Sequence, residues 1–137
     1  SANTQWDGSG RTYIGYCFAE KKGYSKFGSY TGNGNADGTF VYTGFKPAYV
    51  MIKNISTSDP WLMLDTKRDT FNAMEKRLDA NDSDAETTGT DYADFLSNGF
   101  RIIGNLGIHN NNGQNYIYMA FAESPFVNSK GVPTNAR

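Results

Sequence analysis

Carboxylate, imidazole and thiol groups decide which catalytic or metal chemistry a chain can support. This chain of 137 residues contains one histidine, His109, and one cysteine, Cys17, so a zinc site of the usual type cannot be assembled. A Ser–His–Asp arrangement would have to use His109, which lies in a Gly/Asn-rich stretch, and no G-x-S-x-G motif is present to supply the serine. We therefore expect His109 to be an exposed loop residue and not a general base.

Glycoside hydrolysis would need two facing carboxylates. Asp65, Asp69, Asp94 and Glu123 are candidates by residue type, but their spacing selects no pair. A small glycan depolymerase is therefore an alternative hypothesis and not the leading one.

Two loops resemble ligand-binding motifs without matching them. The acidic loop Asp79–Glu86 has the oxygen ligands that calcium prefers, but its sixth position is Asp84 instead of glycine and its twelfth is Thr90. The stretch GNGNADG, residues 32–38, lacks the lysine and the following helix of a phosphate-binding loop. We predict no catalytic residue, no cofactor and no metal site.

The charge and apolar content of the chain exclude two further kinds of partner. Thirteen basic and 14 acidic residues leave a net charge of −1, so a nucleic-acid-binding track is not expected. No apolar stretch approaches the length of a membrane span, so no membrane insertion is expected. Nine Tyr and nine Phe exceed what a core of this size needs, which leaves aromatic side chains for a sugar-binding surface or an oligomer interface.

Short apolar segments separated by turn residues predict an all-β fold, an antiparallel β-sandwich. The expected strands are 12–19, 25–31, 39–43, 48–54, 60–65, 95–96, 100–104 and 114–123. The glycine-rich stretch 32–38 lies between two of these strands and predicts a hairpin loop.

The main departure from this pattern is a charged excursion around residues 66–93. Phe71, Met74 and Leu78 share one helical stripe, which indicates a short helix over residues 70–79. An irregular but ordered excursion fits the composition equally well.

One strand-like segment occurs twice. Thr12–Glu20 reads TYIGYCFAE and Asn115–Glu123 reads NYIYMAFAE, and a glycine precedes each copy at the same distance. Repeats of domain length usually indicate an array of similar modules, so the first copy would close a preceding unit and the second would close this one. The other interpretation is a single domain whose two terminal strands share a pattern.

These observations divide the chain into three parts. They are a polar N-terminal segment, 1–11, a β-sandwich domain, 12–127, and a C-terminal tail, 128–137. Within the domain, 12–20 is either a strand of this sandwich or the closing strand of a preceding repeat unit. In both interpretations Cys17 lies in a covered strand, so we expect a buried, inert thiol.

Several separated motifs occur in an order that resembles a known group of proteins. They are GYSKFGSYTGNG, FVYTGFKPAYVMIKN, WLMLDTKRD, DFLSNGFRI and YIYMAFAESPFVNSKGVPTNAR. From about Tyr13 to Arg137 the chain resembles the C-terminal modules of tail-fibre and adhesin-like virion proteins of marine bacteriophages. The resemblance implies a virion protein, made in the host bacterial cytoplasm, that assembles as a homotrimer with other virion proteins. It further implies attachment to a host surface glycan or protein, or else a structural role in capsid decoration or tail assembly.

Receptor contacts are expected on loops held by a rigid sandwich. The candidate loops are Gly32–Gly38, Ser56–Asp59 and Asn105–Gly113. Their hydrogen-bonding side chains give the candidate receptor-binding residues Asn33, Asn35, Asp37, Asp59, His109 and Asn111.

Overall fold

The computed structural model of the chain describes residues 10–124. Most of the expected polar segment 1–11 and the whole of the expected tail 128–137 lie outside the described residues. The elements in chain order are β1 (Ser25–Thr31), β2 (Asp37–Tyr42), β3 (Tyr49–Asn54), β4 (Trp61–Asp65), β5 (Leu78–Asp79), β6 (Ala93–Leu96), β7 (Gly99–Ile103), α1 (Gly107–Asn110) and β8 (Asn115–Phe121).

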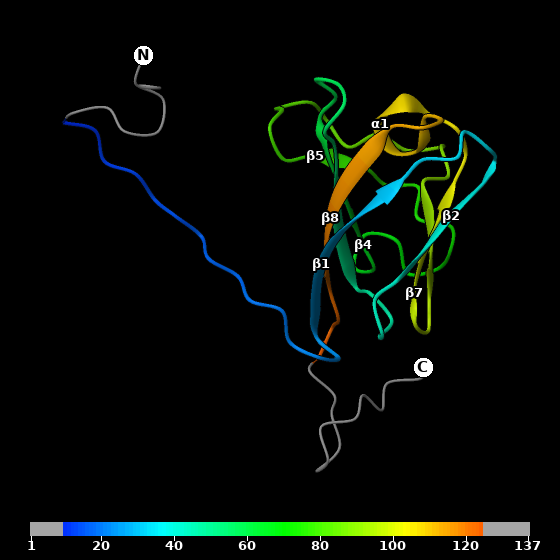
Figure 1. Cartoon of the computed structure of the whole chain (residues 1–137), viewed down its shortest axis with the longest axis horizontal. Coiled ribbons are helices and arrows are strands. Elements are labelled where there is room, and N and C mark those ends of the chain that lie inside the picture. The colour runs from blue at the N-terminus through cyan, green and yellow to red at the C-terminus, as the bar shows by residue number, and fades with distance from the viewer. Residues whose placement is uncertain (1–9, 125–137) are drawn as a thin grey trace, which may run out of the picture.

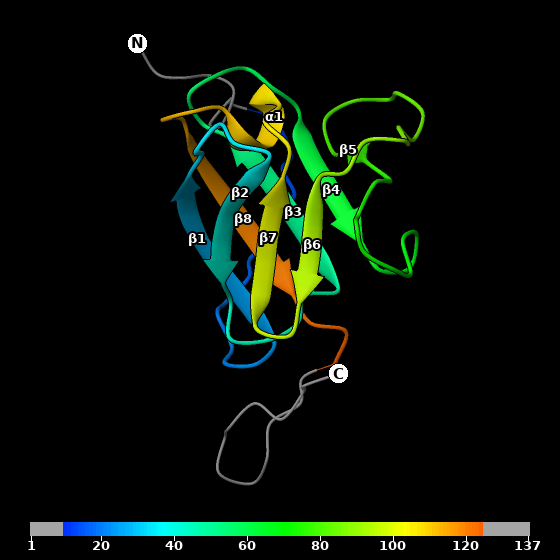
Figure 2. The same cartoon turned by 90° about the vertical axis from the view of Figure 1, so that its right-hand side faces the viewer.

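Two antiparallel sheets pack face to face, which confirms the predicted all-β sandwich (Figure 1). One sheet has the strand order β1-β8-β3-β4-β5, and the other has the order β2-β7-β6. Figure 2 looks onto the three-stranded sheet, with the larger sheet behind it and α1 at one end. β8 pairs with β1 along one side and with β3 along the other, so it lies inside the larger sheet.

The core lies between the two sheets and is formed by every second residue of their strands. Ile52 and Leu62 from the larger sheet and Phe100 from the smaller one are completely buried. Aromatic rings fill the layer between them, since Tyr30 stacks on Tyr116 with ring centroids 5.0 Å apart. Much of the aromatic content is therefore core.

The glycine-rich loop 32–38 is not the predicted hairpin turn. β1 and β2 belong to different sheets, so the loop carries the chain from one layer to the other. The N–H of Gly32 donates to the carbonyl of Gln114 at 2.9 Å, and a Cβ on Gly32 would lie 2.3 Å from the carbonyl oxygen of Asn111. Glycine is thus required here for close approach to a neighbouring loop, a requirement that cannot be told from a tight turn in the sequence.

The charged excursion after β4 follows the irregular alternative, and the short helix over 70–79 is wrong. The backbone N–H groups of Glu75 and Lys76 both donate to the carboxylate of Asp69, at 2.9 and 2.7 Å. These bonds fold the backbone around one buried carboxylate instead of into a helical turn. Phe71, the first residue of the supposed helical stripe, is 83% exposed.

The segment Thr12–Glu20 is not a strand of this sandwich, so the prediction of a covered strand here is wrong. Residues 10–20 run away from the sheets as extended chain (Figure 1). Ile14 and Tyr16 are 80% and 81% exposed, and Cys17, expected to be buried, is exposed as well. The place that the apolar pattern of this segment would suit, between β1 and β3, is occupied by β8.

Candidate functional site

Three loops at the α1 end of the sandwich form the candidate functional site, which we call the loop end. They join β1 to β2 (32–36), β3 to β4 (55–60) and β7 to β8 (104–114), and the last of them contains α1. Figure 2 shows all three at the same end of the molecule, opposite the β6–β7 turn. The structure therefore brings together the three loops that the sequence analysis selected.

Asn110, the last residue of α1, links the first loop to the third by hydrogen bonds of its side chain. Its side-chain amide donates toward the side chain of Asn33 at 3.1 Å and toward the carbonyls of Asn35 and Gly104 at 2.9 and 2.7 Å. Its side-chain oxygen accepts from the N–H of Asn33 at 3.0 Å. Asn110 is completely buried, so these bonds replace its solvation and fix the loop backbone.

Asn54, the last residue of β3, links the second loop to the third by hydrogen bonds. Its buried amide nitrogen donates toward three oxygens, those of the Asp59 side chain at 2.9 Å, the Gly107 carbonyl at 2.9 Å and the Gln114 side chain at 2.7 Å. The hydroxyl of Tyr116 lies beside this network and also donates to the Gly107 carbonyl, at 2.7 Å. Two buried asparagines thus anchor all three loops to the core.

The polar candidates at the loop end divide into exposed and internally bonded residues. Asn35, Asp37 and Asn111 are exposed, although Asp37 also pairs with Arg101 at 2.8 Å. Asn33 is half-buried against Asn110, and Asp59 is half-buried and accepts bonds from Asn54 and Thr57. Receptor contact by these five residues stays a prediction, and the exposed three present the most accessible groups.

His109 is completely buried, so the prediction of an exposed receptor-binding histidine is wrong. Its Nε2 lies 2.7 Å from the carbonyl of Ile103, which requires Nε2–H to donate, and its Nδ1 has no partner among the described residues. The ring packs edge-on against Tyr92, with centroids 5.4 Å apart. The single turn of α1 directs the His109 side chain under the loops, where it fills part of the core.

Burial of His109 makes the stability of the domain depend on pH. Burial lowers the pKa of His109 below its usual 6.5, with the hydrogen bond to Ile103 offsetting part of this. The unfolded chain therefore takes up the proton more readily, so the free energy of unfolding should decrease as pH falls below about 6.5, by at most about 1.4 kcal/mol per pH unit. Urea unfolding between pH 7.5 and 5.5 measures this slope.

The variant His109→Gln is the matched control, because it keeps a donor for Ile103 and removes the titrating group. No other histidine is present in the chain, so the slope in this pH range should largely disappear in the variant. Equal slopes for the two proteins would show that the charge state of His109 does not control stability.

The residues that organise the loop end, Asn54, Asn110 and Tyr116, were not found by sequence reasoning. Asn54 ends an apolar strand, and Asn110 is the first of three consecutive asparagines, of which the other two are exposed. The sequence signal for such anchors is weak. Only the polar residue that ends an otherwise buried strand, as Asn54 does, could have indicated one.

Each carboxylate considered for glycoside hydrolysis is engaged by neighbouring groups. The ion pairs are Asp65 with Arg68, Asp94 with Arg101, and Glu123 with Lys67. Burial alone would raise the pKa of Asp65, but hydrogen bonds from Arg68 bring it below its usual value. Carboxylates paired in this way are suited to holding loops together, and the lowered pKa of Asp65 does not suit a proton donor.

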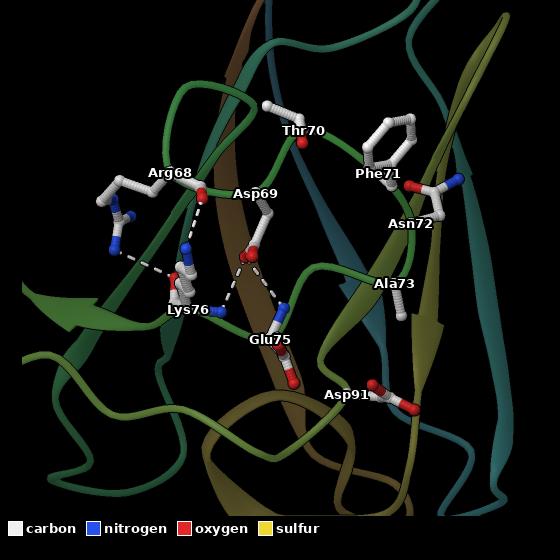
Figure 3. A pocket seen from close by; sticks show the side chains of 9 residues that line it. All are labelled: Arg68, Asp69, Thr70, Phe71, Asn72, Ala73, Glu75, Lys76 and Asp91. Atoms are coloured by element: carbon white, nitrogen blue, oxygen red, sulfur yellow. Dashed lines mark hydrogen bonds between the residues drawn. The ribbon is translucent and has the colours of Figure 1, made fainter.

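A polar hollow lies beside the excursion, and several of its charged side chains form hydrogen bonds that hold the backbone there (Figure 3). The Asp69 carboxylate accepts the two backbone bonds described above, and the ammonium of Lys76 donates to the carbonyl of Arg68 at 2.8 Å. Phe71 and Asn72 stand at the rim of the hollow in Figure 3. These bonds fold the excursion and engage the charged groups of Asp69 and Lys76.

Metal and membrane sites are not evident in residues 10–124. In this part of the chain no group of three or more His, Cys, Asp or Glu side chains is placed to hold a metal ion. Asp79, at the start of the acidic loop, pairs with Arg77 at 2.6 Å, and residues 80–89 are exposed. None of the described helices is long and apolar enough to cross a bilayer.

The larger sheet carries a second candidate surface on the side turned away from the core, which we call the outer face. One continuous row of apolar side chains crosses all five strands in register: Phe27, Met119, Met51, Met63 and Leu78. All five are half-buried, whereas the residues that alternate with them, such as Ile52 and Leu62, are completely buried. Contiguous apolar patches on a protein surface are typical of protein–protein interaction sites, which makes the outer face a candidate.

The sequence of the chain matches a known family of domains. A family model described as a domain of unknown function, DUF7483, matches residues 1–125. The chain belongs to the DUF7483 family. The match spans the DUF7483 sandwich and also the exposed segment before it. No curated protein and no solved structure matches the chain.

Proposed function

We propose that this DUF7483 chain is a non-enzymatic module of a bacteriophage virion, located at the tip of a tail fibre, that binds a host surface glycan or protein. The observation that carries the proposal is the loop end. Three polar loops there are fastened to a rigid sandwich by the buried side chains of Asn54 and Asn110. A surface that is ordered before binding loses little conformational entropy when it binds.

The chemistry of the loop end suits a glycan. Exposed amide and carboxylate groups of Asn35, Asp37 and Asn111 can donate to and accept from sugar hydroxyls, and Ser56 and Thr57 add hydroxyls on the neighbouring loop. Individual contacts of this kind are weak. A homotrimer, as in the virion proteins that the sequence resembles, would multiply them through avidity.

The loop variant Asn35→Ala/Asn111→Ala tests the proposal in the full chain. Binding to cells of candidate bacterial hosts should fall at least about fivefold, because each lost hydrogen bond contributes roughly 0.5–1.5 kcal/mol. Both side chains are exposed, so the urea midpoint should stay unchanged. The control Asp82→Ala/Ser83→Ala alters two equally exposed residues in the acidic loop and should bind like the parent. Unaltered cell binding by the loop variant would contradict a receptor site at the loop end.

The outer face favours a second candidate function, a capsid-decorating or tail-assembly protein without a receptor. Such a protein needs a large apolar contact with another virion protein, and the row of apolar residues on the larger sheet would supply it. Ile117→Lys places a charge on this face at a residue that is 38% exposed. If the parent binds no cells and this variant alone abolishes assembly, as followed by light scattering, the structural function is favoured over attachment.

A further inference from the structure

The exposed segment Thr12–Glu20 has the sequence of a strand that this fold places inside a sheet. Aligned on β8 and its end, Thr12 corresponds to Asn115 and Glu20 to Glu123, and five of the nine positions are identical. Gly10 precedes the first copy as Gly113 precedes the second. The two copies therefore match in register as well as in composition.

In β8 the same pattern belongs to a strand that has a paired strand on each side and buried side chains on its core face. Its residues Tyr116, Tyr118, Ala120 and Ala122 are at most 7% exposed and point into the core. Its backbone pairs with β1 on one side and β3 on the other. The corresponding core-facing residues of the segment would be Tyr13, Gly15, Cys17 and Ala19.

The segment does not have these neighbours in the described structure. Ile14, Tyr16 and Phe18 are 80%, 81% and 59% exposed, which leaves three large apolar side chains of one short stretch mostly in solvent. A contiguous apolar stretch of this kind marks an interaction site. The alternation of the sequence identifies the missing partner as a sheet.

The segment also leaves the sandwich in a defined way. Ser25 Oγ donates to the carbonyl of Ala19 at 2.8 Å, and the carboxylate of Glu20 accepts from the N–H of Phe27 at 3.0 Å. Phe18 packs edge-on against Phe121, with ring centroids 5.6 Å apart. These contacts fix the end of the segment against the start of β1, as a junction between two folded units requires.

We propose that Thr12–Glu20 is the closing strand of a preceding sandwich of the same family, inserted between the first and third strands of that unit. The chain is then one unit of an array in which each sandwich is completed by the residues that lead directly into the next. This inference concerns assembly of the fold and holds whether or not the loop end binds a receptor.

The preceding sandwich is related to this one but not identical to it. At the position of Tyr118, whose ring packs on Phe100 at 5.3 Å and reaches Gly28, the segment has Gly15. Placing the segment in a second copy of this same sandwich would leave a cavity the size of a tyrosine side chain, which is strongly destabilising. The preceding unit must therefore fill this space with a larger residue of its own, and exchange of strands between copies of this chain is disfavoured.

An insertion into the full chain tests the proposal. A copy of residues 21–114 is inserted between Arg11 and Thr12, and Gly15→Tyr is added to restore the ring that this copy needs. Cys17 then takes the place of Ala120, which is completely buried, so its reaction with a thiol reagent should slow at least about 100-fold relative to the parent chain. Addition of Tyr13→Asp, which puts a charge at the buried position of Tyr116, should return the rate to that of the parent.

A second insertion shows whether the inserted copy can fold in this position. It carries NYIYMAFAE, the sequence of Asn115–Glu123, in place of Thr12–Glu20, and should double the unfolding enthalpy of the parent domain. If this chain forms two domains while Cys17 stays reactive in the Gly15→Tyr chain, the proposal is overturned. It is also overturned if Cys17 of the parent becomes protected as protein concentration rises, because the segment would then complete a second copy of this chain.

Discussion

Replacing Gly99 with alanine is expected to lower the free energy of unfolding by about 2–4 kcal/mol. Gly99 begins β7, the central strand of the three-stranded sheet, and pairs with Tyr42 of β2 on one side and Leu96 of β6 on the other. A Cβ at this position would lie 2.1 Å from the carbonyl oxygen of Val41, a backbone atom of the paired strand. Relief requires β2 to move, which disturbs the ladder and the core beneath it. Urea unfolding followed by tryptophan fluorescence measures the loss.

Gly107→Ala is the matched control for this substitution. It makes the same chemical change at the first residue of α1, where an added Cβ would meet no atom within 4 Å. Alanine is a better helix former than glycine, so stability should be unchanged or should rise by up to about 1 kcal/mol. Similar losses in the two variants would mean that steric conflict with Val41 is not the cause.

The second large effect is expected from Asn110→Asp at the loop end. The side-chain amide of Asn110 faces three oxygen atoms, those of Asn33, Asn35 and Gly104. A carboxylate there would place charge against acceptors in a buried site and leave the carbonyls unpaired. We expect a loss of roughly 3–5 kcal/mol, in the range measured when a buried polar network is broken by an unpaired charge.

Two further variants separate the causes of that loss. Asn110→Ala removes the same bonds without adding charge, and should cost about 2–3 kcal/mol. Asn112→Ala alters an exposed residue two positions away and should stay within about 0.5 kcal/mol of the parent. Equal stability of the Asn110→Asp and Asn112→Ala proteins would contradict the anchoring function given to Asn110. Hydrogen exchange of the backbone amides of residues 32–36 should be fastest in Asn110→Asp, slower in Asn110→Ala and close to that of the parent in Asn112→Ala.

Most of the strand pattern could be read from the sequence because burial in a sandwich repeats every second residue. The strand 25–31 was predicted with the bounds that β1 has, and the strands ending at Asn54 and Asp65 begin one residue later than predicted. The ends of these strands are set by the turn-forming residues next to them, and those residues can be identified from the sequence. The assignment of each strand to a sheet depends on contacts far apart in the chain, which explains why a crossing between layers was mistaken for a hairpin.

The loops of the candidate site could be predicted from the sequence, but which of their side chains are buried and which are exposed could not. Asn110 and Asn111 are adjacent and chemically identical, yet one is completely buried and the other exposed. The difference comes from the single turn of α1, which directs His109 and Asn110 inward. A four-residue helix is too short to leave a periodic signal. Burial of the lone histidine was missed for the same reason.

In the segment before β1 the sequence pattern and the observed structure disagree. Its pattern predicts a strand with two apolar faces, whereas residues 12–20 form no strand of this sandwich. Propensity and alternation describe what a segment needs. Which strands meet that need is decided by topology, and here β8 already occupies the position between β1 and β3.

The position of β8 between β1 and β3 also determines when the domain can fold during translation. The residues of β8 that pair with β1 leave the ribosome roughly 90 residues after β1, which at about 5–20 residues per second is a delay of roughly 5–20 seconds. Throughout that interval β1 has no strand beside it in the larger sheet, and β3 is paired on one side only, with β4. A chain truncated by even one strand would remain in this state, so cellular quality control rather than loss of a binding surface would decide its fate.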